Sequence, residues 1–187
     1  MKLEADPGRA PLGAAHTGHD RLMVLRSGSR TLIAIADRTS SVSSVGRVDA
    51  ADRTVEELAR CFDTGVIPDD PHDWEMILQG IDQTLLQEPR CDEASALVML
   101  VRRGLILGAS VGGSSASMLG PDGPPVPLSA ASANDPGLGS GFAVPIGFGP
   151  VPLGGRLVTQ RARRPSDARS PVPSPLFRAW AEGHLHA

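Results

Sequence analysis

The sequence predicts an α+β fold whose strands are joined as antiparallel hairpins. Two observations lead to this prediction. Apolar segments of strand length occur in adjacent pairs, and each pair is separated by a short turn that contains glycine. The segments of helical periodicity come as one pair between the hairpins, rather than alternating with single strands. A parallel sheet needs a long crossover after each strand, so this order favours antiparallel pairing.

The first predicted hairpin joins Arg21–Ser27 to Thr31–Ala36, with Gly28-Ser29 as the turn. The near-continuous apolar character of the second arm indicates a strand that is covered on both faces. Asp37 follows directly at the end of this strand. The preceding residues 1–19 are polar and glycine-rich, and we expect a loop there.

Two helices are predicted after a small-residue loop at Ser40–Gly46. The first spans Asp52–Phe62 and has apolar residues on one face, and Thr54 with Glu57 fits a capping box. The second spans Pro71–Gln87 and carries an apolar stripe at helical spacing, which favours packing on a sheet. The stripe consists of Trp74, Ile77, Leu78, Ile81, Leu85 and Leu86.

A second hairpin covers residues 95–111, with its turn at Arg102-Arg103-Gly104. A tight loop at Gly112-Gly113-Ser114 and a third short strand follow. Residues 124–155 are rich in Pro and Gly and are expected to be mostly loop. Arg156–Val158 begins a further strand, whereas residues 159–187 are rich in Arg, Pro and Ser and are expected to be a disordered tail.

Composition excludes several classes of function. The chain has 187 residues and a net charge of −3, which gives no case for binding nucleic acid or a membrane surface. No apolar run reaches the roughly 18 to 20 residues of a membrane helix, and the N-terminus does not resemble a signal peptide. We therefore expect a cytoplasmic protein, with Cys61 and Cys91 as free thiols. The oligomeric state is not indicated.

Asp37 is the first candidate for chemistry. A carboxylate at the end of a buried strand is typical of a site for Mg²⁺ or Mn²⁺, which prefer oxygen ligands. From position alone, an aspartate that starts a turn by bonding its own backbone is the favoured alternative. His16, His19 and Asp20 are also close in sequence, but a polar loop explains them better than a metal site does.

Other motifs give weaker signals. Gly108–Gly113 lacks the Gly-Lys-Ser/Thr of a P-loop, and Gly137–Gly141 lacks the strand-to-helix context of a dinucleotide site. No Gly-x-Ser-x-Gly segment indicates a serine nucleophile. The sequence therefore offers no covalent nucleophile.

In their order along the chain, several segments resemble the PPM (PP2C-type) serine/threonine phosphatases, particularly the compact bacterial members. Gly108–Leu119 is similar to the family's Ala-x-Val-Gly-Asp-Ser-x-Ala-x-Leu, and Leu32–Asp37 is similar to its strand ending in Asp-Gly. The other similar segments are His19-Asp20, Trp74–Leu85, Glu93–Leu100 and Pro136–Pro145.

The resemblance implies a β-sandwich flanked by helices and incomplete at its C-terminus. The resemblance covers residues 18–158, as a truncated phosphatase domain, and leaves a flexible segment at 1–17 and the tail at 159–187 outside it. It also implies two Mg²⁺ or Mn²⁺ ions, whose bound water attacks a phosphoserine or phosphothreonine of a phosphoprotein. Asp37 matches the bridging metal ligand, Asp20 matches an acidic residue that helps to hold metal-bound water, and Arg38 would lend its backbone carbonyl. Asp20 and Asp37 are therefore the expected catalytic residues.

The sequence departs from the family pattern at four points. His19 stands in place of Glu, Arg38 in place of Gly, and Gly113 in place of Asp, and no acidic residue occurs between Asp135 and Asp167. Arg38 also brings a positive charge next to Asp37. We therefore expect weak or absent phosphatase activity. The alternatives are a non-catalytic pseudophosphatase that binds a protein partner, and a fragment of an active phosphatase whose reading frame changes near residue 159.

Overall fold

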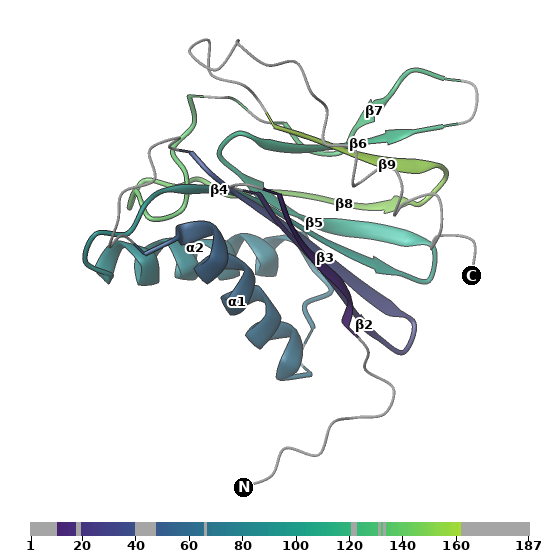
Figure 1. Cartoon of the computed structure of the whole chain (residues 1–187). Helices are drawn as coiled ribbons and strands as arrows, with labels where there is room; N and C mark the ends of the chain where they lie inside the picture. The colour runs from purple at the N-terminus through teal and green to yellow at the C-terminus, as the bar shows by residue number, and fades with distance from the viewer. Residues whose placement is uncertain are drawn as a thin grey trace, which may run out of the picture.

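The computed structural model describes residues 11–17, 20–39, 48–65, 67–120, 123–130, 132 and 134–161. These residues form three layers (Figure 1). Two helices cover one face of a six-stranded sheet, and a three-stranded sheet covers the other face. The predicted α+β class, an antiparallel sandwich flanked by helices, is confirmed.

The larger sheet has the strand order β1-β2-β3-β4-β5-β8, and all neighbouring strands are antiparallel. The two predicted hairpins lie side by side, because β3 pairs with β4. The strands of this sheet are β1 (Pro11–Thr17), β2 (Asp20–Ser27), β3 (Arg30–Arg38), β4 (Ala94–Arg102), β5 (Leu105–Val111) and β8 (Ile146–Pro152).

The loop predicted for residues 1–19 is wrong over Pro11–Thr17, which forms β1. This segment has little strand character of its own, and its backbone is fixed by pairing with β2. Long-range pairing therefore overrides local composition there. Residues 1–10 lie outside the described part of the chain.

The smaller sheet has the order β7-β6-β9. Its strands are β6 (Ser114–Leu119), β7 (Val126–Pro127) and β9 (Arg156–Arg161). The predicted strand at 156–158 is confirmed, but it continues to Arg161, which pairs with Ser114. The rest of the predicted tail, residues 162–187, lies outside the described residues.

The helices are α1 (Ala50–Asp63) and α2 (Pro71–Gln87). The bounds predicted for α2 are confirmed, and Asp70 caps it before Pro71 at the first turn. The predicted capping box of α1 is wrong, because Asp49 is the N-cap and accepts from the backbone amides of Ala51 and Asp52. The hydroxyl of Thr54 instead donates to the carbonyl of Ala50 at 2.7 Å. No helix among the described residues is long and apolar enough to span a membrane.

Two apolar clusters fill the spaces between the layers. Strand alternation assigns each residue to one of them: Leu32, Ala34 and Ala36 pack toward the helices, whereas Ile33 and Ile35 pack toward the smaller sheet. The stripe of α2 is confirmed as core at Trp74, Leu78, Ile81 and Leu85, which are buried, and Ile77 packs against the same cluster. The prediction is wrong for Leu86, which is 52% exposed. This alternation continues to the end of β3, where it decides the direction of the polar side chains.

Candidate functional site

Asp37 and Asp20 occupy directly paired positions on β3 and β2. Asp37 is only 3% exposed. Position 37 has the same parity as Ile33 and Ile35, so it lies on the face toward the smaller sheet. Opposite positions in an antiparallel pair share a face. The structure therefore brings the two sequence candidates to one end of the sandwich.

Two buried serines extend this arrangement. Ser95 pairs with Asp37 from the β4 side, and its hydroxyl donates to the carbonyl oxygen of Asp37 at 3.4 Å. The Ser114 hydroxyl donates to the Ser95 oxygen at 3.1 Å. Sequence reasoning missed both serines, because no spacing motif connects hydroxyls that approach only through the fold.

The turn between β5 and β6 packs against the same end of the sheet. Gly112 has a φ of 67°, and a Cβ placed on it would lie 3.1 Å from the Cβ of Ser95. Gly113 follows and directly precedes Ser114. The position where the resemblance expects an aspartate is thus beside the serines, and it carries no side chain.

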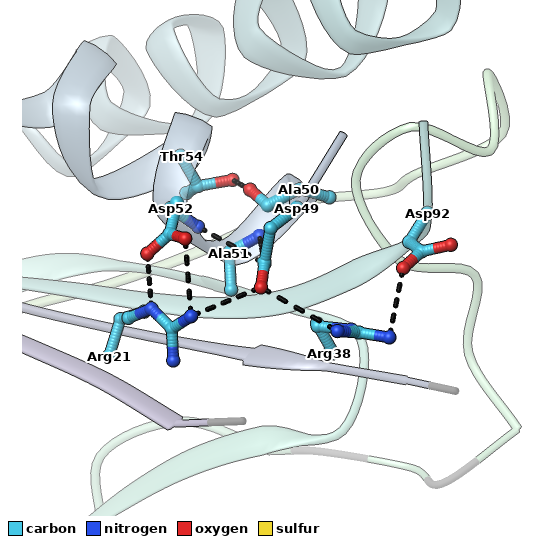
Figure 2. A network of polar contacts seen from close by, with 8 residues as sticks. All are labelled: Arg21, Arg38, Asp49, Ala50, Ala51, Asp52, Thr54 and Asp92. Carbon is cyan, nitrogen blue, oxygen red and sulfur yellow. Dashed lines mark hydrogen bonds and ion pairs between the residues drawn. The ribbon is translucent and has the colours of Figure 1, made fainter. Parts of the chain in front are cut away.

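Arg38 turns away from this face (Figure 2). Its Nη2 lies 3.1 Å from Oδ2 of Asp92, and its Nη1 lies 3.7 Å from Oδ2 of Asp49. The alternation of β3 places position 38 on the helix-facing side, opposite to Asp37. The positive charge that the sequence brings next to Asp37 is therefore directed to two aspartates on the other side of the sheet.

Arg21, which follows Asp20, also directs its side chain to the helix-facing side of the sheet. Its Nη2 lies 3.1 Å from Oδ2 of Asp49 and 3.1 Å from Oδ2 of Asp52. Its Nε also donates to Oδ1 of Asp52. Both arginines thus reach the N-terminus of α1, and neither points toward the face that carries Asp37.

The cysteines are free thiols within the described residues. Burial is the largest cause that raises the pKa of Cys91, and nearby Glu88, Asp92 and Asp49 raise it further, to about 11. Burial also raises the pKa of Cys61. Neither thiol is activated as a nucleophile at neutral pH, because the thiolate is the reactive form.

The donor set does not fit a centre of two divalent metals. The described residues contain no cluster of three or more His, Cys, Asp and Glu side chains that could hold a metal ion. Mg²⁺ and Mn²⁺ need several oxygen ligands and a high ligand charge. Of the predicted histidines, His16 lies in β1 with its backbone paired to Arg21, and His19 is outside the described residues.

No family model and no curated protein matches the chain. Solved structures do match. A variant of a bacterial serine phosphatase, in which one arginine is replaced by glutamate, gives a TM-score of 0.58 at 15% identity. The match covers 79% of this chain and 66% of that one. The serine/threonine phosphatase Stp1 from Staphylococcus aureus gives 0.52 at 10% identity, with 86% of this chain and 74% of that one covered. This chain thus spans slightly less than two thirds of the first relative. At these identities the likeness concerns the fold, and this chain has the fold of the bacterial PP2C-type serine/threonine phosphatases.

Proposed function

We propose that this chain is a homologue of the PPM-type serine/threonine phosphatases with weak or absent phosphatase activity. The fold and the paired aspartates, Asp20 and Asp37, support the phosphatase ancestry. The main support for low activity is the glycine at position 113. It leaves the turn beside Ser95 and Ser114 without a carboxylate, at the end of the sandwich where Asp37 is buried.

The small number of negative charges at the site supports weak metal binding. Two aspartates supply at most two negative charges, and serine hydroxyls are neutral oxygen donors. Two divalent ions would therefore retain a large uncompensated charge at this end of the sandwich. We assign Asp37, Asp20 and the backbone carbonyl of Arg38 as residues that contact at most one Mn²⁺ or Mg²⁺ weakly. No hydrolytic step follows from that arrangement.

Binding of a protein partner is the second candidate. Phe142, Val144 and Ile146 are 78%, 70% and 48% exposed, although all three are large and apolar. They alternate along the segment that enters β8, which is an edge strand of the larger sheet. Exposed apolar residues at an unpaired sheet edge are typical of interaction surfaces.

The proposal is tested by Mn²⁺-dependent hydrolysis of a phosphothreonine peptide by the purified chain. We expect turnover well below about 1 per second, the lower end of the usual enzyme range. The matched variants are Asp37→Ala at the site and Asp135→Ala in an exposed loop. Turnover of about 1 to 1000 per second that is lost only in Asp37→Ala would overturn the proposal.

A further inference from the structure

The paired strands β2 and β3 carry the same dipeptide at the same level. Asp20-Arg21 and Asp37-Arg38 are both Asp-Arg, and Asp20 is the register partner of Asp37. Since successive positions in a strand face opposite sides, the aspartate positions lie on one face and the arginine positions on the other. Asp20 and Asp37 are therefore each followed by an arginine position on the helix-facing side of the sheet.

Asp49 connects the two arginines (Figure 2). Its Oδ2 lies 3.1 Å from Nη2 of Arg21 and 3.7 Å from Nη1 of Arg38. Its other carboxylate oxygen accepts from the backbone amides of Ala51 at 3.0 Å and Asp52 at 3.3 Å. One side chain thus caps α1 and bridges two neighbouring strands at the same time.

The surroundings of Asp49 restrict movement of this bridge. The Asp49 side chain is 20% exposed, and those of Arg21 and Arg38 are 13% and 10% exposed. Charged groups at this depth are screened less by salt than surface pairs are. Asp52 also binds the guanidinium group of Arg21, and Asp92 binds that of Arg38. Besides their backbone ladder, β2 and β3 are therefore also connected through Asp49 on the helix-facing side of the sheet, opposite to the face of Asp37.

We propose that Asp49 is a positioning residue for the Asp20–Asp37 pair. Through Arg21 and Arg38 it fixes the separation of the two strand positions from the opposite face of the sheet. The identification of the pair as a metal-contacting site rests on the proposed function, but the positioning itself does not. The charge of Asp49 carries the effect, since its cap to α1 can be supplied by a neutral side chain.

Backbone amide exchange, followed by NMR, tests this in the full chain. Asp49→Asn keeps a good N-cap and removes the charge that bridges the arginines. We expect exchange at the amides of Arg21 and Ala36, which are register partners across β2 and β3, to become about tenfold faster or more, with little change within α1. The matched control is Asp70→Asn, the same substitution at the N-cap of α2, where Oδ1 accepts from the backbone of His72.

Equal exchange at these two amides in the parent, Asp49→Asn and Asp70→Asn would overturn the positioning role. The conservative variant Arg38→Lys, which retains the positive charge, should keep the slow exchange of the parent. If Arg38→Lys instead exchanged as fast as Asp49→Asn, charge would not be what positions the pair.

Mn²⁺ binding, followed by the EPR signal of the free ion, separates this inference from the proposed function. We expect weaker binding in both Asp37→Ala and Asp49→Asn than in the parent. If Asp37→Ala binds as the parent does, the assigned metal contact is wrong, and amide exchange still decides the role of Asp49. If only Asp37→Ala weakens binding, Asp49 does not position the site and the inference is overturned.

Discussion

Arg38 and Asp92 form an ion pair of 3.1 Å on the helix-facing side of the larger sheet. The Arg38 side chain is 10% exposed and the Asp92 side chain only 2%. The backbone amide of Asp92 also donates to the carbonyl of Val48, which ties this segment to the start of α1. A charge at this depth is tolerated because it is paired, so loss of one partner exposes the full cost of burying the other.

We predict that Arg38→Met lowers the free energy of unfolding by about 3–5 kcal/mol, because Asp92 then loses its buried counter-charge. Urea denaturation monitored by circular dichroism measures this change. The control is Arg60→Ala, which breaks the Arg60–Glu57 pair, where the arginine is 63% exposed. That variant should lose about 0.5 kcal/mol or less. Equal losses in the two variants would show that the Arg38 pair behaves as a surface contact.

The direction of Arg38 could have been predicted from the sequence, whereas its partners could not. Once Leu32–Ala36 is recognised as a strand covered on both faces, alternation puts Asp37 and Arg38 on opposite sides. Asp49 and Asp92 reach Arg38 only because α1 and the segment before β4 pack there. Long-range contacts of this kind leave no periodic signal.

The difference between local patterns and long-range contacts also explains the outcome of the other sequence predictions. Hairpins and the α2 stripe are local patterns and were predicted, but β1 depends on pairing with β2 and was missed. The predicted cap of α1 is wrong because Thr54 and Glu57 fit a local capping motif. The observed N-cap, Asp49, also accepts a hydrogen bond from Arg21, which is distant in the sequence. Ser95 and Ser114 meet only because β4 and β6 lie at the same end of the sandwich.

Gly108 and Gly80 provide a matched test of packing in the sheet. A Cβ on Gly108 would lie 2.0 Å from the backbone carbonyl oxygen of Val98, whereas one on Gly80 in α2 meets nothing within 4 Å. We predict that Gly108→Ala is strongly destabilising, because backbone must shift. Gly80→Ala should stabilise the chain by up to about 1 kcal/mol, as expected for a helix interior. Thermal melting compares the two, and similar melting temperatures would contradict the close approach of β4 and β5.

Glu75 links α2 to β8, and this contact predicts a dependence of stability on pH. Its Oε1 accepts from the backbone amide of Gly147 at 2.6 Å. The hydrogen bond with His72, followed by that from Gly147, holds the pKa of Glu75 below its ordinary value of 4.5. A carboxyl group with a lowered folded-state pKa stabilises the fold above its unfolded pKa, and this contribution is lost as the pH falls through the folded value.

His72 acts in the opposite direction, since its hydrogen bond with Glu75 raises its pKa above 6.5. Its contribution is complete below 6.5 and is lost as the pH rises through the raised value. We therefore predict that both contributions are present between about pH 4.5 and 6.5. Melting temperatures of the parent and Glu75→Gln, measured from well below pH 4.5 to well above pH 6.5, check the prediction. The difference between the two proteins should be largest between these values and become smaller on either side. A difference that stays constant over the whole series would contradict it.

Cys91 is predicted to react slowly with thiol reagents in the native chain. With a pKa of about 11, only about a thousandth of this thiol is ionised at pH 8, compared with about a tenth at the ordinary value of 9.0. Alkylation at pH 8, with each cysteine followed by peptide mass spectrometry, measures its rate. Chain unfolded in urea is the control and should react much faster. Equal rates in native and unfolded chain would show that burial does not protect Cys91.

The last prediction concerns Gly113, where a side chain can be added to the candidate site. Gly112 supplies the left-handed conformation of the turn with a φ of 67°, whereas Gly113 is not among the residues with positive φ. An L-amino acid is therefore tolerated by the backbone at position 113. Gly113→Asp adds a carboxylate directly before Ser114, whose hydroxyl is bonded to Ser95 beside Asp37.

Because cation affinity rises with the charge of the ligand set, Gly113→Asp should bind Mn²⁺ at least about tenfold more tightly than the parent. In EDTA the same variant should melt below the parent, since the added carboxylate is buried without a counter-charge. Mn²⁺ should then raise its melting temperature more than it raises that of the parent. Gly113→Asn is the neutral control of similar size, and Asp37→Ala should abolish the gain in affinity. An equal gain in Gly113→Asn, or a gain that survives Asp37→Ala, would show that the added carboxylate and Asp37 do not act on the same ion.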